Sequence, residues 1–181
     1  VGIGTSTPDA ALDIEGKIWV QQGTRNVVVG RGAGNSLGDD ADYNTMLGLN
    51  AGSNLVSGDS NVFVGDYAGY TATTSYQNVF LGKSAGRNST GNLNVFIGDH
   101  AGENESGSNL LYIENSSSSS PLIWGDFDND ILNFNGNVGI GTTDPNSSLH
   151  VGDGVTADAG LITIQTDNSS NAGLSYLLAD G

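Results

Sequence analysis

Three aspartates near the end of the chain have the spacing of a metal-binding loop. Asp126, Asp128 and Asp130 form the pattern D-x-D-x-D, which opens a calcium loop of the EF-hand type. The pattern then departs from such a loop, because no glycine occupies its sixth position and Asn137 stands where a bidentate glutamate is needed. The residues therefore favour a polar hairpin turn, with a calcium site as the alternative. No cofactor is expected.

Two further carboxylates are candidates for acid–base chemistry on a polysaccharide. Asp66 and Asp99 occupy the same outward position of a repeated segment, two repeats apart. At ~4.8 Å per strand step they would lie about 10 Å apart, slightly beyond the separation used by inverting glycosidases. The chain contains neither a G-x-S-x-G nor an H-E-x-x-H motif. We therefore predict that the chain is not an enzyme, and keep a spike with polysaccharide depolymerase activity as the alternative.

Tyrosines supply the candidate binding residues. Tyr67, Tyr70 and Tyr76 lie in or beside the variable positions of the repeats, where an exposed ring can stack on a sugar. Packing at the rim is the simpler interpretation, and the sequence favours it.

These candidates belong to an array of short repeats. The clearest copies read N-V-F-V-G-D-Y-A-G, N-V-F-L-G-K-S-A-G and N-V-F-I-G-D-H-A-G. Including two looser copies and a degenerate sixth, the repeats begin at Asn26, Asn44, Asn61, Asn78, Asn94 and Asn109. The starts are 18, 17, 17, 16 and 15 residues apart. A short period of this kind predicts a solenoid in which each turn contacts its neighbours.

Five positions of the repeat are nearly constant, and each has a structural role in a stacked array. The asparagines are expected to form a ladder of amide hydrogen bonds, and the phenylalanines a ladder of stacked rings. The glycines allow a turn or a close approach, and the alanines indicate tight packing. In the three clearest copies these structural residues are Asn61, Phe63, Gly65, Ala68, Gly69, Asn78, Phe80, Gly82, Ala85, Gly86, Asn94, Phe96, Gly98, Ala101 and Gly102.

The strand of each repeat is apolar at three successive positions, as in Val62, Phe63 and Val64. Neighbouring strand residues point to opposite faces, so a half-exposed strand would alternate apolar with polar residues. One face fills the inside of the turn, and the other face needs a second partner. We predict that identical chains associate along their length, and a three-fold bundle is a natural form of such an association.

Two longer motifs flank the array. Val1–Gly16 and Val138–Gly152 share the pattern V-G-I-G-T-x-x-P-x-x-x-L-x-[IV], which predicts a strand, a turn with proline and a second strand. The glycines resemble a phosphate-binding loop only weakly, since a third glycine is missing and no helix is expected after them.

Composition restricts the range of partners. The chain of 181 residues carries 20 acidic and only 5 basic residues, for a net charge of −15. Such a chain is repelled by nucleic-acid phosphates and lacks a basic face for anionic lipid. It has no cysteine and no apolar run of the ~20 residues needed to cross a membrane.

The N-x-h-h-G-x-x-A-G repeats, where h is apolar, resemble the head repeats of trimeric autotransporter adhesins and related arrays in bacterial surface and phage tail-fibre-like proteins. The V-G-I-G-T motifs resemble the connectors of such fibres. The resemblance covers about residues 1 to 153. It implies an all-β, left-handed parallel β-roll in an intertwined homotrimer, within an extracellular fibre of a cell surface or a virion. The implied function is a rigid rod that takes part in attachment to cell-surface glycans or a receptor.

The sequence divides into five parts by these patterns. A connector spans residues 1–20, and the β-roll repeats span residues 21–115. A hairpin over 116–137 closes the array, and a second connector covers 138–153. Residues 154–181 read as the start of a further β module.

Overall fold

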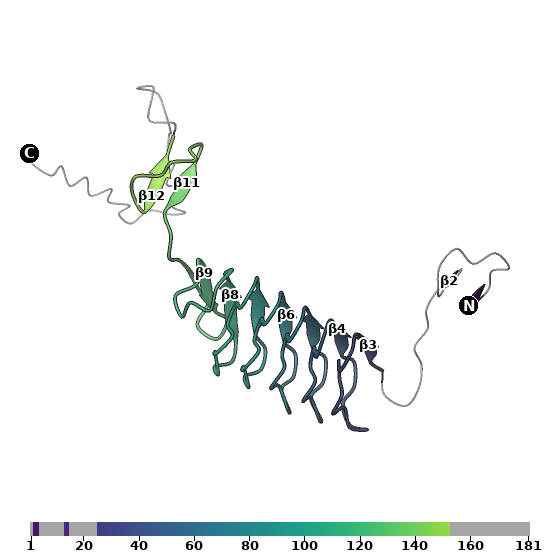
Figure 1. Ribbon diagram of the computed structural model, residues 1–181. Helices are drawn as coiled ribbons and strands as arrows, with labels where there is room; N and C mark the ends of the chain where they lie inside the picture. Colours follow the sequence, from purple (N-terminus) through teal and green to yellow (C-terminus); the bar gives the residue numbers. More distant parts are fainter. Residues whose placement is uncertain (1, 4–12, 15–24, 153–181) are drawn as a thin grey trace, which may run out of the picture. The chain divides into compact units, whose positions relative to one another are not determined.

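The computed structural model describes residues 2–3, 13–14 and 25–152 (Figure 1). Every regular element in this part of the chain is a β-strand. The chain divides into one unit over Val1–Gly136 and a second over Asn137–Gly181. The predicted β module over 154–181 and most of the connector over 1–20 lie outside the described residues.

The repeats form a parallel β-solenoid of about five turns, whose stacked coils are visible in Figure 1. Each coil contributes one short strand, and the strands pair in parallel at the same position of the repeat. These strands are β3 (Val27–Val29), β4 (Thr45–Leu47), β5 (Val62–Val64), β6 (Val79–Leu81), β7 (Val95–Ile97) and β8 (Leu110–Ile113). The predicted solenoid is therefore confirmed for a single chain.

A hairpin continues the same sheet beyond the last coil. Strand β9 (Ile123–Asp126) pairs antiparallel with β8, and β10 (Ile131–Phe134) pairs antiparallel with β9. The resulting sheet has eight strands in the order β10-β9-β8-β7-β6-β5-β4-β3. The hairpin thus supplies partners for the backbone groups of β8, which would otherwise form a free edge.

The interior is a column of stacked side chains from the middle residue of each strand. Phe63, Phe80 and Phe96 are fully buried, and successive rings stack with centroids 5.1 and 4.9 Å apart. Met46 continues the column towards β3, and Tyr112 ends it against Phe96 with centroids 5.1 Å apart. The predicted aromatic ladder is confirmed.

Buried asparagines hold successive coils together at one corner. The side-chain oxygen of Asn61 accepts a hydrogen bond from the backbone N–H of Asn78 at 3.1 Å, and Asn78 accepts one from Asn94 at 2.9 Å. The side-chain amide of Asn78 also donates to the carbonyl oxygen of Gly91 at 3.0 Å. Each amide therefore satisfies backbone groups that face the interior and could not reach water.

Glycine is required at two places in each coil. Gly82 has a φ of 138°, and a Cβ atom there would overlap the backbone of Gly98 in the next coil. Gly86 has a φ of 54°, and a Cβ atom there would overlap the ring of Phe80. The alanine between them, Ala85, is fully buried. The small residues of the repeat thus set how closely coils approach and how closely the turn packs on the rings.

The last coil begins one residue later than its asparagine suggests. Alignment on asparagine predicts that Asn109 follows Asn94 in the ladder, but β8 pairs with β7 so that Leu111 faces Val95 and Tyr112 faces Phe96. Asn94 accordingly accepts the backbone N–H of Leu110 at 2.9 Å. Asn109 instead has a φ of 62°, a left-handed conformation that asparagine tolerates well. That part of the prediction is wrong by one residue.

The two connector motifs form the same small structure. Strand β1 (Gly2–Ile3) pairs in parallel with β2 (Asp13–Ile14), and β11 (Val138–Ile140) pairs in parallel with β12 (Leu149–Val151). In both motifs each residue faces the residue eleven positions later in the chain. The predicted pair of strands is confirmed at both places.

Candidate functional site

The outward side of the solenoid sheet is apolar. In β6 the central Phe80 is fully buried, whereas Val79 and Leu81 are 36% and 45% exposed. The same alternation of an inward central residue and two more accessible flanking residues recurs in β5 and β7. The sequence prediction that both sides of these strands are apolar is thus confirmed, and the outer side is uncovered in the single chain.

Strand register gathers these flanking residues into two continuous columns, which we call column A and column B. Column A contains Val27, Thr45, Val62, Val79, Val95, Leu111, Gly125 and Leu132. Column B contains Val29, Leu47, Val64, Leu81, Ile97, Ile113, Ile123 and Phe134. We call the surface they form the apolar outer face. No charged residue occurs in either column, although the chain carries a net charge of −15.

The closing hairpin belongs to this face. Because directly paired residues point to the same side of a sheet, Leu132 continues column A and Phe134 continues column B. Both side chains are more than half exposed. Monomeric proteins rarely leave so long a contiguous apolar strip in contact with water, so this strip is the strongest candidate interaction surface of the described residues.

Two of the three candidate tyrosines lie together. The rings of Tyr67 and Tyr70 are 5.5 Å apart and tilted, and the guanidinium of Arg87 lies 5.1 Å from the centre of the Tyr67 ring. Arg87 also forms an ion pair with Glu103 at 3.7 Å. Both tyrosines are half-buried, whereas Tyr76 is 43% exposed and belongs to a different corner of the coil. The pair Tyr67–Tyr70 presents an aromatic surface, in keeping with either rim packing or stacking on a sugar.

The aspartates of the D-x-D-x-D pattern form the turn of the hairpin. Asp126 accepts hydrogen bonds from the backbone N–H of Asp128 at 2.9 Å and from the side chain of Asn129 at 2.7 Å. These bonds, the Asn129 side-chain bond first, hold the pKa of Asp126 below its usual range. Asp128 accepts the side-chain amide of Asn109 at 2.9 Å. Asp130 follows with a φ of 54°. Within the described residues, no group of three or more acidic or histidine side chains is placed to hold a metal ion.

The candidate acid–base residues lie in one column with a lysine between them. The glycines that precede Asp66, Lys83 and Asp99 stack directly on one another. Asp66 accepts the backbone N–H of Leu49 at 3.0 Å, and Asp99 lies 2.9 Å from the imidazole of His100. The two carboxylates therefore have separate partners, and neither of them lines the pocket at Tyr112 or the cleft at Ile113.

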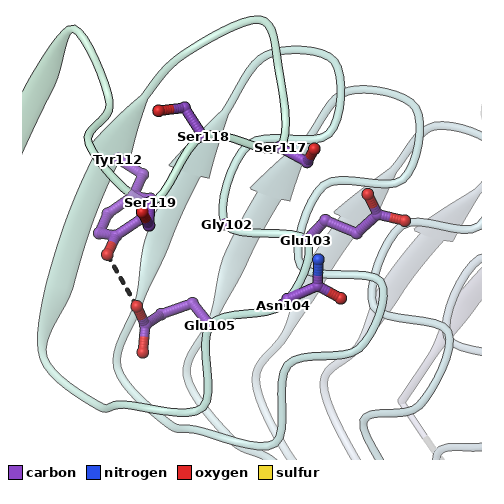
Figure 2. A pocket seen from close by; sticks show the side chains of 8 residues that line it. All are labelled: Gly102, Glu103, Asn104, Glu105, Tyr112, Ser117, Ser118 and Ser119. Carbon is purple, nitrogen blue, oxygen red and sulfur yellow. Dashed lines mark hydrogen bonds between the residues drawn. The ribbon is translucent and has the colours of Figure 1, made fainter.

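A small pocket at the end of the aromatic column was not foreseen from the sequence. Figure 2 shows the hydroxyl of Tyr112 pointing at Glu105, to which it donates a hydrogen bond of 2.7 Å. Burial, followed by this carboxylate, raises the pKa of Tyr112 to about 12. The pocket has a volume of about 70 Å³ and is otherwise lined by Gly102, Glu103, Asn104, Ser117, Ser118 and Ser119. That volume suits water molecules and is far below the ~300 Å³ of a typical ligand pocket.

No protein-family model, curated protein or solved structure matches this chain. Across the residues that the structure describes, no helix has the length and apolarity needed to cross a membrane. The candidate function therefore rests on the geometry of the chain itself, and above all on the apolar outer face.

Proposed function

We propose that this chain is a structural and adhesive segment of an extracellular homotrimeric fibre. The observation that carries the proposal is the apolar outer face, which runs without a charge across all eight strands. Burial of such a face is favourable by about 25 cal/mol for each Å² removed from water. A partner that matches the whole face needs the same axial repeat of coils, and a second copy of the chain has that repeat.

The shape of the apolar outer face favours three copies over two. The face is about 34 Å long at ~4.8 Å per strand step but only two side chains wide. A flat contact between two such strips is too narrow to supply the roughly 800 Å² per partner of a stable interface. In an arrangement of three copies around a common axis, the apolar outer face of each copy points to the axis. Column A of one copy can then contact column B of the next, so that both sides of each face are buried. A cyclic arrangement of this kind also closes on itself.

The second unit agrees with an assembly of several chains. Strands β11 and β12 form a sheet of two strands, and such a sheet is marginally stable in water on its own. Ile140 and Leu149 in this sheet are 56% and 55% exposed. Copies of the connector brought together around one axis would cover these side chains.

In this arrangement the fibre is stiff because backbone hydrogen bonds between coils run along its length. Acidic and amide-rich turns face the solvent and keep the rod soluble. The turn that carries Tyr67 and Tyr70 is the candidate surface for cell-surface glycans or a protein receptor. Attachment can be tested by binding of the purified segment to an array of glycans, compared with Tyr70→Ala.

The oligomeric state provides the decisive test. Light scattering should give three times the 18.5 kDa mass of one chain. Leu81→Asp places a charge on the apolar outer face and should abolish the trimer, whereas Thr74→Asp on an exposed turn should leave it intact. A wild-type chain that is folded and monomeric at high concentration would overturn the proposal.

A further inference from the structure

A cleft opens beside column B at the last two coils. It has a volume of about 340 Å³ and is lined by Ile97, Gly98, Ile113, Glu114, Asn115 and Leu122. Ile97 and Ile113 belong to the apolar outer face, and Leu122, 58% exposed, forms the opposite wall. The cleft is thus a lateral extension of that face, at the edge where the coils turn away from the sheet.

Hydrogen bonds within one loop hold the outer wall of the cleft in place. The carboxylate of Glu114 accepts hydrogen bonds from the backbone N–H of Asn115 at 2.7 Å and from that of Leu122 at 3.0 Å. The hydroxyl of Ser116 donates to the same carboxylate at 3.1 Å. These bonds close the loop and fix Leu122 opposite the isoleucines. They also satisfy the carboxylate, so the only charged group that lines the cleft is already paired with donors of its own loop.

The opposite edge of the same coil carries an exposed leucine. Leu93 precedes β7 on the column A side, has a φ of 59° and is 40% exposed. The left-handed conformation costs a leucine roughly 1–2 kcal/mol, whereas asparagine adopts it readily. Asn109 occupies the equivalent corner of the next coil with a φ of 62°. The same corner has a positive φ in the other described coils as well, at Tyr43, Ser60, Gln77 and Asn109, and Leu93 is the aliphatic residue of this series.

We infer that Leu93 of a second copy of this chain occupies the cleft between Ile113 and Leu122. The inference rests on the proposed assembly, in which the column A edge of one copy faces the column B edge of the next. Leu93 and the cleft lie on opposite edges at the level of the same coil, so a parallel assembly in register brings them together. Each cleft is then completed by a neighbouring copy, and the contact fixes the axial register of the chains.

Cysteine cross-linking tests the contact directly, because the chain contains no cysteine of its own. Leu93 and Leu122 flank opposite ends of short strands, so about 10 Å or more of extended chain separates them within one copy. A disulfide needs Cα atoms closer than about 7 Å. Mild oxidation of the double variant Leu93→Cys, Leu122→Cys should therefore give covalent dimers and trimers. The pair Thr74→Cys, Leu122→Cys should give none.

The outcomes separate this inference from the proposed function. Trimers by mass that do not cross-link through the Leu93–Leu122 pair would overturn the inference and leave the fibre proposal standing. Folded monomers would overturn both.

A second variant separates assembly from folding. Leu93→Asn suits the left-handed corner, so the unfolding of the isolated chain should be unchanged or shifted to higher urea. Association should nevertheless weaken by about ten- to hundredfold for each lost contact, measured by sedimentation equilibrium. Unchanged association would overturn the inference.

Discussion

The rings of Phe80 and Phe96 stack face to face, with centroids 4.9 Å apart and planes only 3° from parallel. The spacing follows from the distance between paired strands, because the two residues face each other directly in β6 and β7. Each ring is in turn covered by a glycine of its own coil. The buried residues beside the rings are mostly small, such as Ala68, Ala85 and Ala101, so they cannot fill the space that a lost ring would leave.

Truncation of a ring in this column should be costly. Phe80→Ala is expected to lower the free energy of unfolding by about 3–5 kcal/mol, since both neighbouring rings lose a contact and the backbone cannot collapse onto the cavity. Val79→Ala, at the adjacent outward position, is the matched control and should cost much less in the monomer. Urea unfolding followed by circular dichroism measures both. Equal losses for the two variants would contradict the role of the ring column in the core.

The asparagine ladder should respond to the loss of a single amide. Asn78→Ala leaves the N–H of Asn94 and the carbonyl of Gly91 buried without partners. The expected loss is about 2–6 kcal/mol, because each of the two unsatisfied buried groups costs about 1–3 kcal/mol. Asn88→Ala removes an exposed amide that bonds Asn104 and should be nearly neutral. Comparable melting curves for these two variants would refute the role of the ladder.

Asn78→Asp extends the same test to pH. The new side chain keeps the acceptor for Asn94 but places a charge, fully buried, against the carbonyl of Gly91. The folded-state pKa of this aspartate is expected to rise above its unfolded value. Stability should then be greatest at low pH and should fall as the pH rises through the folded-state pKa. A pH-independent loss would contradict the burial of the ladder.

The raised pKa of Tyr112 predicts that the folded chain loses stability at alkaline pH. Its pKa in the folded chain is about 12, compared with 10.0 for an ordinary tyrosine. Between these values the unfolded chain loses the proton while the folded chain retains it, so stability falls as the pH rises. Below pH 10 the contribution is fully present. Tyr112→Phe should flatten this part of the urea-midpoint profile, and an unchanged slope would show that Tyr112 titrates normally.

Calcium should not stabilise the hairpin. The carboxylate oxygens of Asp126 and Asp128 already accept hydrogen bonds from Asp128, Asn129 and Asn109. A calcium ion needs six to eight oxygen ligands, and within the described residues no group of three or more acidic side chains converges to supply them. Thermal melting in millimolar calcium and in a chelator should therefore coincide. A midpoint that rises with calcium concentration would instead indicate a site.

The features predicted correctly are those that depend on the repeat alone. Phe63, Phe80 and Phe96 stack because equal positions of successive coils pair in register, and the spacing of the motif already contains that information. Asn109 was placed incorrectly for a physical reason. Asparagine fits both the buried ladder and the left-handed corner, and only strand pairing distinguishes the two positions. The aromatic Tyr112 was the better guide to the register.

The remaining features depend on contacts that a sequence pattern does not encode. Leu132 and Phe134 join the apolar outer face only because β10 pairs with β9 in one particular register. Glu105 meets Tyr112 across a turn whose path the repeat does not fix. The same holds for the candidate tyrosines. The local turn brings the rings of Tyr67 and Tyr70 together, whereas Tyr76 lies at a different corner, and the sequence pattern does not distinguish these positions.

The asparagine ladder also bears on how such a chain can change in evolution. Asn61 and Asn78 each accept a backbone N–H from the following coil, and each in turn gives its own N–H to the amide of the coil before. Every internal coil thus presents the same bonding surface above and below. A whole coil can be duplicated or deleted without any new chemistry at the joint. The length of the solenoid can therefore change in evolution by whole coils. The number of coils would then set the distance between the segments at its two ends.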